Sequence, residues 1–130
     1  MKPLSLTDRL YLLSRKGVDV IDPRQTFVDD TVRLDRIFPG SALFPGTRLL
    51  GPNTLVAPGA KVGSEGPATI VDSAIGENAE IASGYVSGSV LLTKARIGSN
   101  GHVRAGTLLE EEASTAHAVG LKQTILTSFV

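Results

Sequence analysis

The feature that most constrains this chain is a six-residue periodicity in its second half. Residues 91–126 divide into LLTKAR, IGSNGH, VRAGTL, LEEEAS, TAHAVG and LKQTIL, whose fifth positions are mostly small. An α-helix would space apolar residues three or four apart, and a simple strand every second residue. A period of six instead fits a short flat strand followed by a turn. We expect the first positions to point inward, and all but Thr115 are aliphatic. They are Leu91, Ile97, Val103, Leu109, Thr115 and Leu121.

This periodicity predicts a coil with three flat sides. Three hexads complete one turn, so residues 18 apart stack on parallel strands about 4.8 Å apart. Gly and Asn supply the left-handed turn conformations, and an aromatic content of only 5% suits a narrow, repetitive core. We therefore predict an all-β fold, a left-handed parallel β-helix of hexapeptide repeats with about six coils. Crossovers between parallel strands are generally right-handed, and hexapeptide β-helices are an exception to that rule. We therefore take the left hand from the hexapeptide pattern. A β-sandwich is the alternative, but it would show unequal strands and turns every 8–12 residues.

The first half shows the same pattern with interruptions. Hexads begin at Leu50, Val56, Val62, Ile75 and Ile81. The register slips between Val62 and Ile75, and again between Ile81 and Leu91, and short loops or bulges are expected there.

The N-terminal segment differs from the repeats. Ser5 and Asp8 have the spacing of a capping box, and Gly17 is a plausible stop, so residues 6–16 are predicted to form an amphipathic helix that covers the first coil. Its expected apolar stripe is Leu6, Leu10, Leu12 and Leu13. We assign residues 1–17 to this cap and residues 18–130 to the β-helix. The ending ILTSFV stops in mid-pattern with an apolar tail, so we expect a fragment of a longer β-helix.

Composition argues against several classes of partner. Thirteen basic and thirteen acidic residues cancel, and the basic ones form no stripe, so nucleic acid is not an expected partner. The absence of Cys excludes disulfides and thiolate zinc sites and fits a cytoplasmic protein. Asp8, Arg9, Arg15 and Lys16 break the N-terminal apolar run, and no stretch approaches the roughly 20 apolar residues of a membrane span. We predict a soluble, cytoplasmic protein.

Two cations are the best candidates for a ligand site. Arg104 and Lys122 are each the second residue of a hexad and lie 18 residues apart, so they should stack on adjacent strands. Like charges at that spacing repel unless an anion bridges them, and a phosphate would suit the Arg fork and the Lys point charge. The alternative is a pair of solvated surface cations. His102 and His117, placed on one face, are too few for a three-His zinc site, so no metal site is predicted.

The residues around these cations resemble a known family. The stretch Val103–Leu126 is similar to the sugar-phosphate segment of bifunctional N-acetylglucosamine-1-phosphate uridyltransferase/glucosamine-1-phosphate acetyltransferase, and Gly17–Asp30 is similar to the start of that family's β-helix. The resemblance implies that Arg104 and Gly106 match an Arg-Pro-Gly turn, with Ala105 in place of Pro, and that Lys122 matches the phosphate-binding Lys. It also implies a small-molecule sugar phosphate as ligand, a homotrimer, and acetyl-CoA as acyl donor in a complete member.

The chain also departs from that family. The run that precedes the family's Lys is Asn-Phe-Val-Glu, whereas residues 117–120 read His-Ala-Val-Gly, which removes an acidic residue at Gly120. The family's catalytic His lies beyond the Lys, past Val130. We therefore predict no catalytic residue, no cofactor and no complete active site in this chain. Two functions remain open: a hexosamine-phosphate-binding relative of these enzymes, and a non-catalytic trimerisation or regulatory module.

Overall fold

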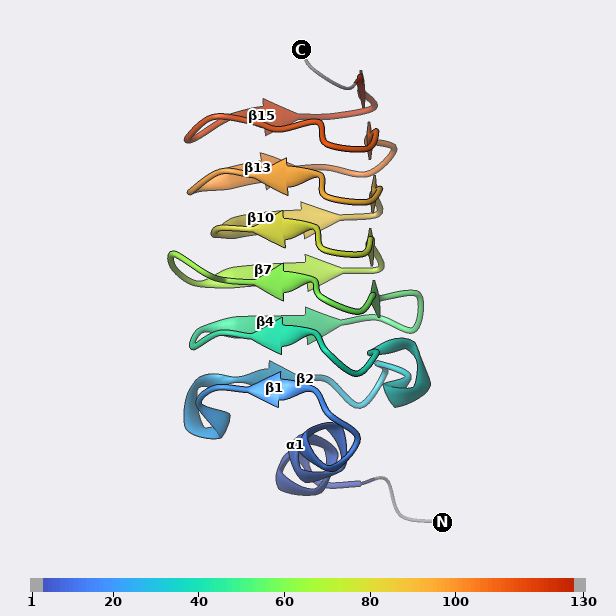
Figure 1. Cartoon of the computed structure of the whole chain (residues 1–130), viewed down its shortest axis with the longest axis vertical. Coiled ribbons are helices and arrows are strands. Elements are labelled where there is room, and N and C mark those ends of the chain that lie inside the picture. The colour runs from blue at the N-terminus through green and yellow to red at the C-terminus, as the bar shows by residue number, and fades with distance from the viewer. Residues whose placement is uncertain (1–3, 128–130) are drawn as a thin grey trace.

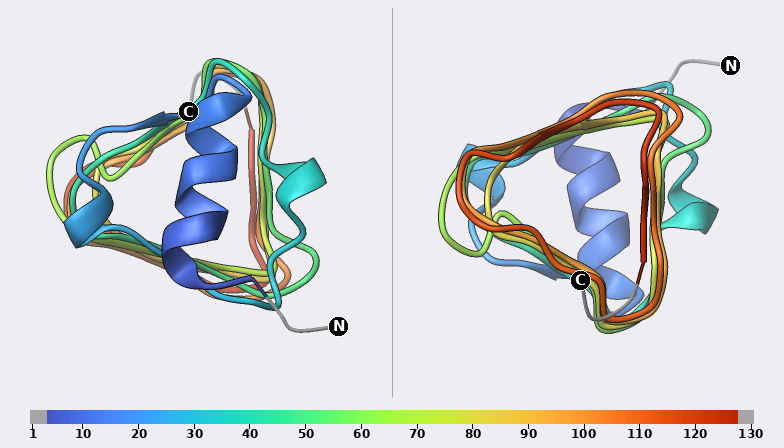
Figure 2. Two further views of the ribbon diagram at one scale, coloured as in Figure 1. Left: turned by 90° about the horizontal axis from the view of Figure 1, so that it is seen from below. Right: turned by 90° about the horizontal axis from the view of Figure 1, so that it is seen from above.

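The computed structural model describes residues 4–127, which form a parallel β-helix closed at one end by a helix (Figure 1). Viewed along its axis, the coils superimpose on a single triangle, and helix α1 (Leu6–Arg15) lies across the N-terminal end (Figure 2). The predicted β-helix of about six coils with an N-terminal helix is confirmed. Residues 1–3 and 128–130, which belong to the expected cap and to the expected open end, lie outside the described residues.

The three sides of the triangle are parallel sheets, here called A, B and C. Sheet A contains β1 (Asp19–Val20), β3 (Ala42–Leu43), β6 (Lys61–Val62), β9 (Glu80–Ile81) and β12 (Arg96–Ile97). Sheet B contains β2 (Phe27–Val28), β4 (Thr47–Leu50), β7 (Ala68–Val71), β10 (Gly84–Ser87), β13 (Gly101–Val103) and β15 (Gly120–Leu121). Sheet C contains β5 (Leu55–Val56), β8 (Ala74–Ile75), β11 (Val90–Leu91), β14 (Leu108–Leu109) and β16 (Ile125–Leu126). Two 3-10 turns, η1 (Pro23–Gln25) and η2 (Leu34–Arg36), interrupt the first coils.

The core consists of three ladders of aliphatic side chains, one behind each sheet. The inward residues pair in register from coil to coil, and those in the middle coils are almost completely buried. In sheet B the ladder is Val28, Leu49, Ile70, Val86, Val103 and Leu121. The first-position residues Leu91, Ile97, Val103 and Leu109 were all predicted to point inward, and all are buried.

The turns between strands use left-handed backbone more widely than the sequence suggests. From Leu91 to Gly120 the fourth residue of each hexad takes a positive φ, and beside Asn100 and Gly106 this includes Lys94, Glu112 and Ala118. Each of these non-Gly residues costs of order 1 kcal/mol of strain. The coil geometry therefore dictates the turn conformation, and residue preference follows only in part.

One position of the predicted hexad frame is wrong by one residue, and a second departs from the repeat. Leu50 was expected to point inward, but Leu49 is fully buried between Val28 and Ile70 of the neighbouring strands, and Leu50 is only half-buried at the end of β4. In the last hexad the sixth residue, Leu126, pairs with the buried Leu109, and the fifth residue, Ile125, is 66% exposed.

The N-terminal cap follows the predicted capping chemistry. The Asp8 amide donates to Ser5 Oγ at 3.1 Å, and α1 ends just before Gly17, whose φ is +103°. Leu10 and Leu13 are buried against the first coil, whereas Leu12 is 43% exposed and does not belong to the apolar stripe. The buried guanidinium of Arg9 donates to the Val28 carbonyl through Nε and Nη2, which fixes the helix to β2.

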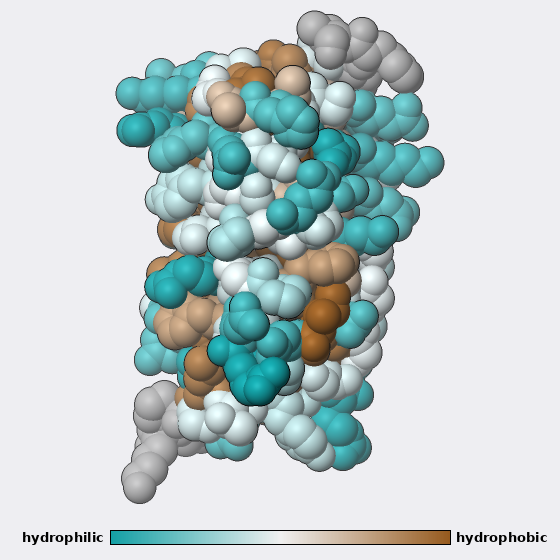
Figure 3. Space-filling model, turned by 90° about the vertical axis from the view of Figure 1, so that its left-hand side faces the viewer, coloured by the Kyte–Doolittle hydropathy of each residue, from teal (hydrophilic) through white to brown (hydrophobic). Residues whose placement is uncertain are grey.

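The outer surface is mixed in character. On the side shown in Figure 3, hydrophilic and intermediate residues predominate, and hydrophobic residues form separate patches. In residues 4–127 no helix has the length and apolarity to cross a bilayer.

Candidate functional site

The outer face of sheet B carries two columns of side chains. Because Tyr85 pairs with His102 and His102 with Gly120, these three form one column over β10, β13 and β15. The second column follows two residues later along each strand, and it contains Ser87, Arg104 and Lys122. The two predicted cations therefore stack on adjacent coils, as the spacing of 18 required.

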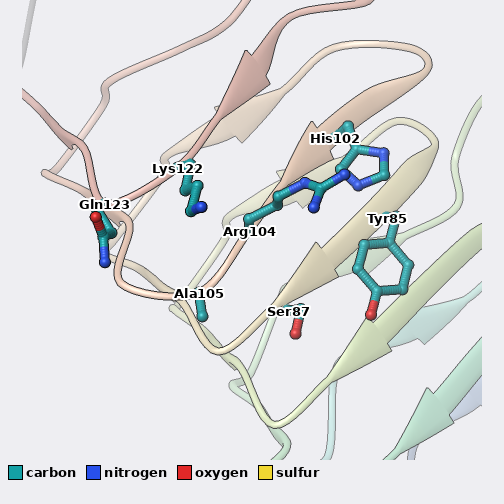
Figure 4. A pocket seen from close by; sticks show the side chains of 7 residues that line it. All are labelled: Tyr85, Ser87, His102, Arg104, Ala105, Lys122 and Gln123. Atoms are coloured by element: carbon teal, nitrogen blue, oxygen red, sulfur yellow. The ribbon is translucent and has the colours of Figure 1, made fainter.

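Both cations border shallow depressions in this face. The first, of about 500 Å³, is lined by Tyr85, Ser87, His102, Arg104, Ala105, Lys122 and Gln123. The second lies beside it and is lined by His102, Arg104, Gly120, Leu121 and Lys122. Figure 4 shows the Arg104 side chain extending toward the His102 ring, with Lys122 on the next coil. A volume of this size is typical of small-molecule sites.

The cations have no counter-charge within the described part of the chain. Neither Arg104 nor Lys122 takes part in a salt bridge or a side-chain hydrogen bond among residues 4–127. Both side chains are exposed, and the residues that line the two depressions include no Asp or Glu. The result is a local concentration of positive charge on a chain whose formal net charge is zero.

The backbone that carries Arg104 is held firmly. Its carbonyl oxygen accepts from Ser89 Oγ at 2.9 Å and from Thr107 Oγ1 at 3.0 Å, and its amide donates to the Leu121 carbonyl at 2.7 Å. Three buried or half-buried residues on three successive coils thus fix this turn. Such preorganisation lowers the entropy cost of binding.

Gly106 shapes this turn without lining either depression. The inward residues Val103 and Leu109 are six residues apart, whereas the equivalent pairs on the coils below and above, Val86–Leu91 and Leu121–Leu126, are five apart. The extra residue is accommodated by Gly106 at φ +85°, where a Cβ would lie 3.2 Å from Gln123 Cγ. Gly106 therefore allows the wider turn that follows Arg104.

Sequence reasoning missed Tyr85, Ser87 and Gln123 as neighbours of the cations. Tyr85 lies 17 residues before His102, in the region where the hexad register slips, so the frame could not place it. Its ring packs on His102 with a centroid distance of 5.2 Å and an interplanar angle of 38°. His117, expected on one face with His102, lies instead in the turn before β15. Among residues 4–127 no group of three His, Asp or Glu side chains could hold a metal ion.

Comparison with known proteins identifies the relatives of this chain. It is 40% identical over 97 residues to the bifunctional protein GlmU of Paenarthrobacter aurescens strain TC1, a match that covers 75% of this chain and 18% of that protein. The chain is a GlmU homologue. Bifunctional protein GlmU of Nocardia farcinica is 34% identical over 104 residues, covering 78% of this chain and 20% of the relative. For Cutibacterium acnes GlmU the identity is 34% over 110 residues, with 85% and 25% covered.

These matches agree with the fold. A β-helix is consistent with the acetyltransferase β-helix of GlmU, and the chain is a GlmU relative built on that fold. It spans about a fifth of the length of the curated relatives it matches. No protein-family model matches the chain.

Proposed function

We propose that this GlmU homologue binds a hexosamine phosphate, with the phosphate held between Arg104 and Lys122. The observation that carries the proposal is the stacking of two unpaired cations, within residues 4–127, beside depressions whose lining contains no acidic side chain. A phosphate dianion neutralises both charges at once. Arg offers a planar fork for two phosphate oxygens and Lys a mobile point charge, so the pair suits one tetrahedral anion.

The site belongs to a larger assembly in this proposal. The chain corresponds to a part of its bifunctional relatives, and the depressions hold no acid or base that the resemblance would assign to catalysis. We propose that Arg104 and Lys122 form the binding part of a site whose catalytic groups lie elsewhere. We further propose a cytoplasmic homotrimer, and acetyl-CoA as the acyl donor in a complete member. Sedimentation equilibrium tests the trimer, because association depends on protomer concentration: a monomer mass at a protein concentration of about 100 µM counts against it.

The binding proposal is tested by isothermal titration at low salt with N-acetylglucosamine-1-phosphate and glucosamine-1-phosphate. At least one should bind to the wild type, and Arg104→Gln and Lys122→Gln should each weaken that binding at least tenfold, about 1.4 kcal/mol, as the loss of a charge-assisted hydrogen bond implies. Circular dichroism verifies that both variants fold.

Lys94→Gln is the matched control. Lys94 is an exposed cation in a turn on the same coil, but it lines neither depression. Binding unchanged in Lys94→Gln supports the site. Absence of heat with the wild type, or an equal loss in the control, overturns the proposal and favours a non-catalytic trimerisation or regulatory module.

A further inference from the structure

The sugar-phosphate site has no group that would neutralise a positively charged ligand. In the described chain, neither column on the outer face of sheet B contains an acidic residue from β4 to β15. One column reads Arg48, Thr69, Tyr85, His102 and Gly120, and the other reads Leu50, Val71, Ser87, Arg104 and Lys122.

Acidic residues on neighbouring elements are engaged elsewhere. Asp72 lies in the turn after β7 and accepts from the Asn53 amide at 3.1 Å. Glu65 accepts from Arg96 at 2.6 Å and from Ser99 Oγ at 2.9 Å. The run 110–112 follows β14, on sheet C. None of these carboxylates lines the depressions.

Gly120 leaves an open slot in the second depression. His102 is covered on one side by the Tyr85 ring, and on the other side its register partner is Gly120, which has no side chain. A Cβ added at Gly120 would meet only the His102 carbonyl oxygen, at 3.8 Å, an ordinary van der Waals contact. The slot is therefore bounded by an imidazole, bare backbone and the two cations.

We propose that this slot receives an uncharged sugar, so that the site prefers an N-acylated or hydroxylated hexose phosphate to one with a free amine. The inference rests on the proposed function, since it needs the phosphate at Arg104 and Lys122. A sugar ring has an apolar face that can lie against an imidazole. An ammonium group in the slot is instead repelled by two cations and meets no carboxylate, which weakens binding by about three- to tenfold at low salt.

The test compares three ligands by isothermal titration: N-acetylglucosamine-1-phosphate, glucose-1-phosphate and glucosamine-1-phosphate. The first two should bind the wild type at least threefold more tightly than the third. Gly120→Glu places a carboxylate in the slot and should reverse this order. Gly120→Gln, which has nearly the same size without the charge, should retain the wild-type order.

The outcomes separate the two proposals. If the amino sugar phosphate binds the wild type as tightly as the two neutral ligands, or if Gly120→Glu and Gly120→Gln behave alike, the neutral-sugar inference is wrong while the phosphate site stands. If none of the three ligands binds, the proposed function fails, and this inference fails with it.

Discussion

The two stacked cations should reduce the stability of the ligand-free protein, and Lys122→Gln measures this cost. Arg104 and Lys122 lie on adjacent coils without a counter-charge among residues 4–127. Two like charges about 5 Å apart in water repel by roughly 0.8 kcal/mol, and side-chain motion reduces this to about 0.5 kcal/mol for exposed groups. Removing one charge should therefore stabilise the fold, and raise Tm by about 2 °C in a chain of this size.

The assay is thermal unfolding by circular dichroism at 10 mM and 1 M salt. The gain should be present at 10 mM and disappear at 1 M, where the Debye length falls to about 3 Å. Lys94→Gln is the control of opposite sign, because backbone hydrogen bonds place the Lys94 turn between two turns that contain the acidic residues Glu77 and Glu112. Its stability should be unchanged or lower at 10 mM salt. If the Tm of Lys122→Gln at 10 mM salt is unchanged or lower, as is expected of Lys94→Gln, the two cations do not repel measurably and the prediction is refuted.

Three further predictions concern the fold. Gly84→Ala should destabilise the fold by about 3 kcal/mol or more, or prevent folding, because Gly84 has a φ of +118° and a Cβ there would lie 2.0 Å from the Gly101 carbonyl oxygen. The matched variant Gly120→Ala should change stability by about 0.5 kcal/mol or less. Urea titration of both variants checks this, and similar midpoints would contradict it. Arg9→Met should cost about 2 kcal/mol, since the Val28 carbonyl loses its buried donors; an unchanged urea midpoint would show that α1 docks without this contact. Hydrogen bonds from the Thr31 side chain and amide hold the pKa of Asp29 below its ordinary value of 3.8. Because the folded pKa is the lower one, the stabilisation is present above pH 3.8 and is lost as the pH falls through the folded pKa; Asp29→Asn should therefore lower Tm at pH 6 and change it less at pH 2, and equal shifts at both values would contradict the assignment.

The hexad pattern predicted the fold because each hexad carries one obligatory inward residue. Ile97 and Val103 have no aliphatic residue beside them in the chain, so their burial could be predicted directly. At Leu49–Leu50 and Ile125–Leu126 two apolar residues are adjacent, and the pattern cannot decide between them. There the pairing with Ile70 or Leu109 on the neighbouring strand determines which side chain is buried.

Turn lengths were the part that sequence could not supply. A turn of five or six residues between inward positions is set by how its backbone bonds to the coils on either side. The Gly106 amide donates to the Gly88 carbonyl at 3.0 Å, and the Gln123 amide donates to the Ala105 carbonyl at 3.3 Å. Gln123 takes a φ of 47°, so the chain turns there although no Gly or Asn in the sequence indicates a turn.

The residues of the candidate site could be predicted only where the coil has its regular length of 18 residues. Arg104 and Lys122 flank a coil of regular length, so their stacking followed from the count of 18. Tyr85 and Ser87 lie on the preceding coil, which is one residue shorter, and only the strand pairing brings them beneath His102 and Arg104. The binding of a sugar phosphate there stays a prediction.

Backbone amide mapping by NMR tests the central claim most directly, because it locates a ligand residue by residue. Titration with N-acetylglucosamine-1-phosphate should shift the amide resonances of His102, Arg104, Gly120 and Lys122 together in a saturable manner, and should leave that of Lys94 unchanged. Saturable shifts confined to another sheet, or no shifts at a ligand concentration of about 10 mM, well above the range of useful small-ligand affinities, would contradict the assignment of this face as the phosphate site.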